Sequence, residues 1–217
     1  MNELLRNVKV LIWDFDGTLY KMTPLIATAV KEADYKVVMN HTGWSKEKTI
    51  EEFNKVYMVK TPSSTKTASI LSNISLLDAA IECETYKDRK PHLGPDPRLS
   101  EMFLKLSFYK HYILANGVKD RVLSALTILG VSSVQFEEIV TAQIVGVNKP
   151  DTKGFEYIME KSGLPAVAHL MIGDREAVDL APAKMLGMKT CLVWADGAST
   201  VADVTLKTVY EVATILV

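Results

Sequence analysis

The sequence has few cysteines, almost no net charge and no long apolar run, and each of these absences excludes a class of protein. Cys83 and Cys191 are the two cysteines among 217 residues, and they lie too far apart for a metal-binding pair or a disulfide framework. Lys and Arg number 25 against 26 Asp and Glu, so the chain lacks the basic excess typical of nucleic-acid-binding proteins. We therefore predict two buried thiols in a reducing compartment and no nucleic-acid partner.

Membrane-crossing and secretory segments are also missing from the sequence. No window approaches the ~20 apolar residues that a transmembrane helix needs. The apolar run near the N-terminus, residues 8–13, is interrupted by Lys9 and ends at Asp14, which is not the pattern of a secretory signal peptide. We accordingly expect no membrane partner and a cytoplasmic location.

The chain does contain enough apolar sequence for a large core. Its hydrophobic fraction of 48% is ordinary for a globular protein and excludes wholesale disorder. A chain of this length buries close to ~70% of its unfolded surface, so the core needs no disulfides. At roughly 150 residues per domain, the length leaves room for one domain and a small second one.

Short apolar segments alternate with helical patterns over much of the chain. Strands are predicted at residues 8–13, 111–115, 139–140, 169–172 and 190–194. Apolar residues at spacings of three and four predict helices between them, and these helices end at Gly130, Gly163 and Gly187. Because parallel strands need crossover connections, this alternation predicts the α/β class with a doubly wound parallel sheet. After Gly197 we expect one more strand, near residues 205–208, and a short terminal helix.

The stretch from residue 21 to residue 96 breaks this alternation. Thr23 and Pro24 form a helix start, three apolar helical faces follow, and no segment has the pattern of a strand. Asp96 and Pro97 then begin another capped helix. We therefore predict two domains, which are an α/β core formed by residues 1–20 and 97–217 and a small all-helical domain formed by residues 21–96.

Functional residues follow several of the predicted strands. Ligands of open α/β sheets bind in the crevice at the carboxyl ends of the strands. The residues found at these ends or in nearby loops are Asp14, Asp16, Asn116, Gly117, Lys149, Asp174 and Asp179. They converge on one crevice if the first, second and fourth predicted strands are neighbours.

Carboxylates that gather at one point repel each other and lose hydration, so such a cluster favours a hard divalent cation. Mg²⁺ takes oxygen ligands, keeps several waters and accepts a substrate phosphate as a further ligand. One carboxylate could then act as nucleophile, a second one two residues later as general acid, and a lysine could offset charge on the transferring group. Each part also has a structural explanation, as a turn, a helix cap or a surface lysine, and their joint occurrence favours the chemical one.

Three motifs resemble those of the haloacid dehalogenase (HAD) superfamily. They are DFDGTLY at residues 14–20, Lys149-Pro150-Asp151, and GDREAVD at 173–179 followed by AKMLGMKT at 183–190. The resemblance covers residues 1–20 and 97–197, and the helical insertion is similar to the small helical cap of the first cap class. Residues 94–106, with YILANG at 112–117, are loosely similar to pyrimidine 5′-nucleotidase-like phosphatases.

The resemblance implies a role for each of three aspartates. Asp14 would be the nucleophile and a Mg²⁺ ligand. Asp16 would protonate the leaving group and later activate water, with its main-chain carbonyl on the metal. Asp174 would be a further metal ligand. The acid at Asp16 favours phosphate transfer, because members that cleave carbon–halogen bonds lack an acid there.

The resemblance also assigns supporting roles. Lys149 would steady the nucleophile and the phosphoryl oxygens. Asp179 would hold groups around the metal or position Lys149, and Thr18 would support the loop. Independently of the resemblance, we expect Asn116 and Gly117 to bind the phosphate, with the main-chain N–H of Asn116 in place of a side-chain hydroxyl.

Two residues depart from the family pattern. Ala115 stands where a Ser or Thr hydroxyl normally binds a phosphoryl oxygen, and the lost hydrogen bond would be worth about 1.5–3 kcal/mol. Arg175 stands where a small polar residue is common; pairing with a carboxylate is the favoured explanation, and a contact with phosphate or substrate is the alternative.

From these residues we expect a Mg²⁺-dependent phosphohydrolase acting on a small phosphorylated metabolite through an aspartyl phosphate on Asp14. A nucleoside monophosphate is the first candidate substrate and a sugar phosphate the second. Two alternatives remain, which are a catalytically weak phosphate-binding or regulatory protein, favoured by Ala115, and a phosphomutase.

Overall fold

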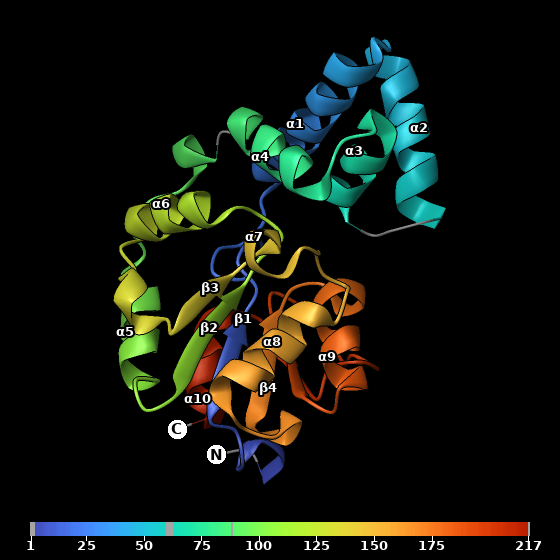
Figure 1. Cartoon of the computed structure of the whole chain (residues 1–217). Helices are drawn as coiled ribbons and strands as arrows, with labels where there is room; N and C mark the ends of the chain where they lie inside the picture. Colours follow the sequence, from blue (N-terminus) through green and yellow to red (C-terminus); the bar gives the residue numbers. More distant parts are fainter. Residues whose placement is uncertain (1–2, 60–62, 88, 217) are drawn as a thin grey trace.

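The computed structural model describes residues 3–59, 63–87 and 89–216, and a six-stranded sheet lies at its centre (Figure 1). The strands are β1 (Val10–Trp13), β2 (Lys110–Leu114), β3 (Glu138–Val140), β4 (His169–Gly173), β5 (Lys189–Leu192) and β6 (Val204–Thr205). Their order is β3-β2-β1-β4-β5-β6, and all neighbours are parallel. The chain steps outward from β1 on one side and from β4 on the other, which confirms the predicted doubly wound sheet. It also places the switch point, where ligands bind in such sheets, between β1 and β4.

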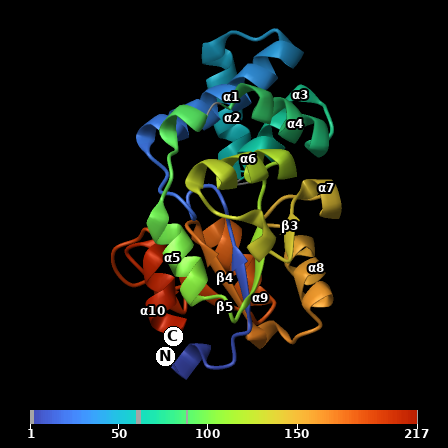
Figure 2. The same ribbon diagram turned by 90° about the vertical axis from the view of Figure 1, so that its left-hand side faces the viewer.

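Helices cover both faces of this sheet (Figure 2). The longer ones are α5 (Pro97–Lys105), α6 (Lys119–Leu129) and α8 (Lys153–Ser162), and the short ones are α7 (Ala142–Val145), α9 (Ala181–Met185) and α10 (Val212–Leu216). Single turns lie at Glu3–Leu5, Lys90–His92, Ser133–Gln135, Ala166–Ala168 and Val209–Glu211, and a π-helical turn spans Glu176–Leu180. The predicted helix ends at Gly130 and Gly163 are confirmed, because both glycines adopt the left-handed conformation after α6 and α8.

The alternation of side chains along β1 divides the core into two layers. Leu11 and Trp13 pack with residues of α5, α6 and α10, whereas Val10 and Ile12 pack with residues of α8 and α9. All four side chains are fully buried. A strand buried on both faces explains why the sequence shows a continuous apolar run here rather than an alternating one.

Four helices form a layer of their own beyond the end of the sheet (Figure 1). They are α1 (Pro24–Thr42), α2 (Lys46–Val59), α3 (Ser64–Ser72) and α4 (Leu76–Tyr86), which we call the α1–α4 layer. The described part of residues 21–96 contains no strand, in agreement with the sequence. Thr23 caps α1 as predicted, since its hydroxyl accepts a hydrogen bond from the Ile26 N–H at 3.3 Å. Tyr35, Phe53 and Cys83 belong to a separate small core inside this layer.

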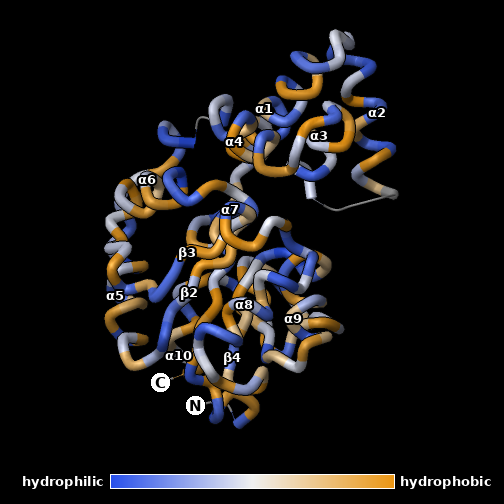
Figure 3. The backbone as a smooth tube through the Cα atoms, viewed as in Figure 1, coloured by the Kyte–Doolittle hydropathy of each residue, from blue (hydrophilic) through white to orange (hydrophobic). Residues whose placement is uncertain are grey.

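Some predicted strands are shorter in the structure. The first begins at Val10 rather than at residue 8, and the last comprises Val204 and Thr205 instead of residues 205–208. Hydropathy along the tube alternates within α5, as expected for a helix with one buried face (Figure 3). Among the described residues, no helix is both long and apolar enough to cross a membrane.

Aromatic packing against β1 generates a prediction about stability. The Phe103 ring is 2% exposed and lies 5.1 Å from the Trp13 ring and 5.3 Å from the Phe136 ring, measured between centroids. We expect Phe103→Ala to lower the free energy of unfolding by about 3–5 kcal/mol, because a cavity replaces the ring. Phe108 is 97% exposed, and Phe108→Ala is the matched control, with an expected change below about 0.5 kcal/mol. Urea denaturation measures both, and equal losses would contradict the assigned packing.

Candidate active site

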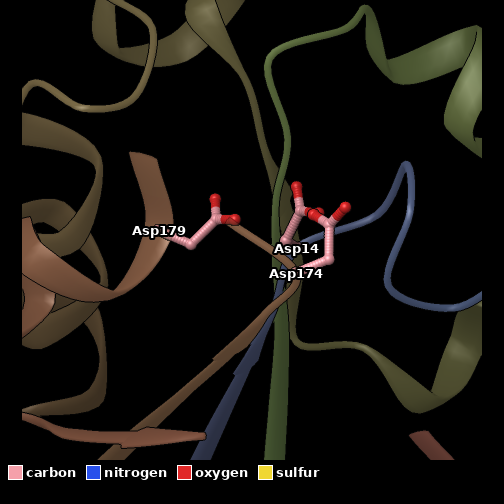
Figure 4. A group of neighbouring side chains, drawn as sticks. All are labelled: Asp14, Asp174 and Asp179. Carbon is pink, nitrogen blue, oxygen red and sulfur yellow. The ribbon is translucent and has the colours of Figure 1, made fainter. Parts of the chain in front are cut away.

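Two adjacent strands bring the first and third motifs together. Trp13 and Ile172 are register partners in β1 and β4, and the Asp14 N–H donates to the Ile172 carbonyl at 2.9 Å. Asp14 and Asp174 therefore leave the sheet side by side, with Asp179 next to them (Figure 4). One oxygen of each carboxylate lies within 4.8 Å of the others. The convergence expected from the strand ends is confirmed for these three residues.

Lys149 lies in the middle of this cluster. Its Nζ is 2.7 Å from Asp14 Oδ1 and 2.7 Å from Asp179 Oδ1, and its side chain is 1% exposed. Burial alone would lower the pKa of Lys149, but the Asp14 and Asp179 carboxylates outweigh it and raise the pKa. The ammonium group therefore stays charged in a place from which water is largely excluded.

Asp14 is held at both of its oxygens. Lys149 contacts Oδ1, and the Thr18 hydroxyl donates to Oδ2 at 2.8 Å. The Thr18 carbonyl in turn accepts a hydrogen bond from Trp194 Nε1 at 2.9 Å, which ties the loop after β1 to the segment after β5. Burial raises the pKa of Asp14, while Lys149 opposes the shift. The contacts fix the plane of the Asp14 carboxyl group.

Glycines make this close approach of carboxylates sterically possible. A Cβ atom on Gly17, which has φ +91°, would lie 2.3 Å from Asp174 Oδ2. A Cβ atom on Gly173 would lie 2.6 Å from the Asp179 Cβ. No side chain fits at either position without displacing an acidic residue, which explains the glycines of the first and third motifs.

The π-helical turn after β4 places Asp179. The Arg175 N–H donates to Asp179 Oδ2 at 3.1 Å, and the Asp179 N–H donates to the Arg175 carbonyl at 2.9 Å. Arg175 Nε lies 3.9 Å from Asp174 Oδ1, so the carboxylate pairing expected for this arginine is present but long. The turn directs the Asp179 carboxylate toward Lys149, one of the two roles that the resemblance implied.

Of the three carboxylates in this cluster, Asp174 is the one that Lys149 does not contact. Its Oδ1 accepts no hydrogen bond from the described residues. Burial, together with the charges of Asp14 and Asp179, raises the pKa of Asp174 to about 7. A buried oxygen without a donor beside two further carboxylates is a set of ligands that suits a hard divalent cation. The residues present therefore fit the metal that the sequence predicted.

Asp16 is not part of this cluster, and it contacts a residue that the sequence did not single out. Its Oδ1 accepts a hydrogen bond from the Tyr20 hydroxyl, and its Oδ2 lies 3.2 Å from Arg89 NH2. Burial alone would raise the pKa of Asp16, but Arg89 and the Tyr20 hydroxyl outweigh it and lower the pKa. Arg89 lies in the irregular segment between α4 and α5, where no periodic pattern marks it.

The end of β2 holds Lys149 in place rather than presenting a side chain to the crevice. Asn116 Nδ2 donates to the Lys149 carbonyl at 3.0 Å, and Asn116 Oδ1 accepts from the Lys149 N–H at 2.8 Å. Ala115 is buried and has no hydroxyl to offer. A phosphate contact by the main chain of Asn116 or Gly117 stays a prediction, whereas the side chain of Asn116 has a structural task.

The uncompensated state of Asp174 predicts how stability depends on pH and on metal. Its pKa rises from 3.8 in the unfolded chain to about 7 in the metal-free fold, so the unfolded state loses its proton first and stability falls between pH 4 and pH 7. At pH 8 without metal, we expect Asp174→Asn to raise the free energy of unfolding by about 1–3 kcal/mol, with little change at pH 4. Mg²⁺ should stabilise the wild type and leave the variant unchanged.

Urea unfolding in EDTA and in Mg²⁺ measures both effects. Glu160→Gln, a change of an exposed acid on α8, is the control and should respond to Mg²⁺ like the wild type. An Asp174→Asn variant that Mg²⁺ stabilises as much as the wild type would contradict the assignment of a cation to this cluster.

Comparisons with known proteins agree with this geometry. The family model of haloacid dehalogenase-like hydrolases matches residues 11–193. Two curated relatives are named glyceraldehyde 3-phosphate phosphatase. The one from Methanocaldococcus jannaschii is 26% identical over 191 residues, 84% of this chain and 83% of that protein. The one from Methanothermobacter thermautotrophicus is 24% identical over 194 residues, 86% of this chain and 85% of that protein.

Solved structures share the fold across nearly the whole chain. A HAD phosphatase from Thermococcus onnurineus superposes with a TM-score of 0.68 at 24% identity, covering 96% of this chain and 98% of that one. L-2-haloacid dehalogenase from Xanthobacter autotrophicus superposes with a TM-score of 0.61 at 14% identity, with the same coverage. The family match includes β2 to β5 and every residue of the acidic cluster, so this chain belongs to the haloacid dehalogenase-like hydrolases.

Proposed function

We propose that the protein is a Mg²⁺-dependent phosphatase that moves a phosphoryl group from a small phosphomonoester to Asp14 and then to water. The observation that carries this proposal is the buried Lys149 ammonium held between Asp14 and Asp179, beside the uncompensated Asp174. Asp14, Asp174 and the main-chain carbonyl of Asp16 would hold Mg²⁺. When bound, the ion would offset negative charge on the transferring group.

The chain's own residues supply the remaining chemistry. Asp14 attacks phosphorus through a carboxylate oxygen, and the bond from phosphorus to the leaving oxygen breaks. Asp16, once protonated, gives that proton to the leaving oxygen, so the alcohol leaves neutral. A water molecule then attacks the phosphorus of the aspartyl phosphate and passes a proton to Asp16. The bond between phosphorus and the Asp14 oxygen breaks, inorganic phosphate leaves, and the Asp14 carboxylate and the protonated Asp16 are restored. Lys149 offsets charge on Asp14 and on the phosphoryl oxygens throughout.

We further propose that the α1–α4 layer is a cap and that the chain divides into a core of residues 1–20 and 97–217 and a cap of residues 21–96. The separate apolar core of the layer supports this division. A cavity of about 420 Å³ is lined mostly by residues of the helical segment, such as Tyr35 and Tyr57, and it reaches Arg175 after β4. The leaving group would lie in this cavity, because Arg175 directly follows Asp174, and closure would exclude water.

The curated relatives favour a short sugar phosphate as the substrate. Both are named for glyceraldehyde 3-phosphate and align over more than four fifths of this chain. Support for a nucleoside monophosphate comes from the looser resemblance of residues 94–106 and 112–117 alone. We therefore place triose phosphates first and nucleotides second. A screen of phosphorylated metabolites tests this order, and analysis of the product, free phosphate or an isomerised sugar phosphate, separates a phosphatase from a mutase.

A reducing, cytoplasmic location is part of the same proposal. Cys83 and Cys191 are buried free thiols, and burial raises the pKa of both. Such thiols are ordinary core residues in a cytoplasmic protein.

Replacing the phosphoryl acceptor tests the proposed reaction. We expect Asp14→Asn to lower kcat by at least about 10³-fold, because an amide is no nucleophile toward phosphorus. The measurement is Mg²⁺-dependent phosphate release from glyceraldehyde 3-phosphate and from p-nitrophenyl phosphate. Glu160→Gln serves as the control and should keep full activity. If the Asp14→Asn variant turned over at the rate of the wild type, Asp14 would not be the acceptor.

Ala115 favours a second candidate function, phosphate binding with little turnover, and a pair of variants decides between the two. Thr and Val have the same shape, and Thr alone adds a hydroxyl. If the missing hydrogen bond limits the enzyme, Ala115→Thr should raise kcat/KM by about 10- to 150-fold over Ala115→Val, which corresponds to the ~1.5–3 kcal/mol of a charge-assisted hydrogen bond. Equal rates in the two variants would mean that another group already replaces the hydroxyl.

A further inference from the structure

Arg89 connects the α1–α4 layer to the acid proposed for the reaction. Its NH2 group lies 3.2 Å from Asp16 Oδ2 and 3.0 Å from Glu84 Oε1. Arg89 and Glu84 are 7% and 3% exposed. Asp16 belongs to the loop after β1, whereas Glu84 belongs to α4, so one guanidinium group joins the two layers beside the crevice.

Glu84, the partner of Arg89, has two further close neighbours. Glu84 Oε1 also lies 3.5 Å from Lys87 Nζ, and a Cβ atom on Gly117 would lie 3.2 Å from the same oxygen. Buried charges of this kind are strongly destabilising when one partner is removed, so each constrains the other's position. Glu84 therefore orients the guanidinium group, and the absence of a side chain at Gly117 leaves room for the Glu84 carboxylate.

The charges of Arg89 and Glu84 already balance each other, so Arg89 does not need Asp16 as a counter-ion. The Asp16 side chain is 32% exposed, so water could hydrate it without Arg89. Tyr20 occupies Oδ1 and Arg89 occupies Oδ2, so both oxygens have a fixed donor. A carboxyl group fixed at both oxygens has one orientation, and proton transfer requires such an orientation toward the leaving oxygen.

We infer that Arg89, oriented by Glu84, is a positioning residue that aims the Asp16 carboxyl group at the leaving oxygen of the substrate. The inference rests on the proposed function, since it takes Asp16 as the proton donor. Because Glu84 is carried by α4, the aim of Asp16 depends on how the α1–α4 layer sits on the sheet. The layer thereby takes part in the chemical step as well as in enclosing the substrate.

Leaving groups of different basicity provide the test. The alcohol of glyceraldehyde 3-phosphate must be protonated as it leaves, whereas p-nitrophenolate leaves without a proton. In single-turnover measurements of phosphoryl transfer, we expect Arg89→Met to slow glyceraldehyde 3-phosphate by about 100-fold and p-nitrophenyl phosphate by less than about fivefold. Glu84→Gln should slow the alkyl substrate by about tenfold, because an amide oxygen still accepts from Arg89 but orients it less firmly. KM should change little in both variants.

Controls separate this role from folding and from binding. Arg98→Met removes an exposed arginine that pairs with Asp96, and it should leave both rates unchanged. If Arg89→Met does not fold, Arg89→Lys keeps the buried charge, and it should slow the alkyl substrate alone. Equal losses on both substrates, a rise confined to KM, or unchanged rates would each overturn the inference. A wild type without activity on either substrate would instead refute the proposed function.

Discussion

Charge balance at the carboxyl ends of β1 and β4 is the constraint on which the whole site depends. Three carboxylates have oxygens within 4.8 Å of one another, and a single buried ammonium contacts two of them at 2.7 Å. One ammonium group cannot neutralise three carboxylates. Burial and the negative charges of Asp14 and Asp179 therefore raise the pKa of Asp174. A bound divalent cation would remove that imbalance, and its binding free energy would then stabilise the fold. The same repulsion that weakens the metal-free protein thus creates affinity for the ion.

Much of the surrounding chain serves to hold the lysine and the carboxylates this close. The Asn116 side chain forms two hydrogen bonds with the main chain of Lys149, one with its N–H and one with its carbonyl. Asn116 therefore fixes the position of Lys149 from the end of β2. Gly17 and Gly173 leave the space that Asp174 and Asp179 occupy. The positions of the charged groups therefore depend on neutral residues that take no part in the proposed reaction.

The acidic cluster could be predicted from the sequence because its cause is local. An apolar run ends in an acid at Asp14 and again at Asp174, and parallel register then sets the two side by side. The contact of Arg89 with Asp16 could not be predicted, since it joins distant parts of the chain through a segment with no periodic pattern. The task of the Asn116 side chain was missed for the same reason, because its partner is the main chain of another loop.

The fold alone does not choose between phosphate transfer and dehalogenation, since solved structures of both kinds superpose on this chain. The choice depends on the residue two positions after Asp14. A halide ion leaves without a proton, so a dehalogenase gains nothing from an acid at that place. Here the acid is present, and the chain commits a tyrosine hydroxyl and a buried arginine to fixing its orientation. Burying Arg89 costs hydration that only well-placed partners can offset. This arrangement around Asp16 supports the proposal of a leaving group that needs a proton.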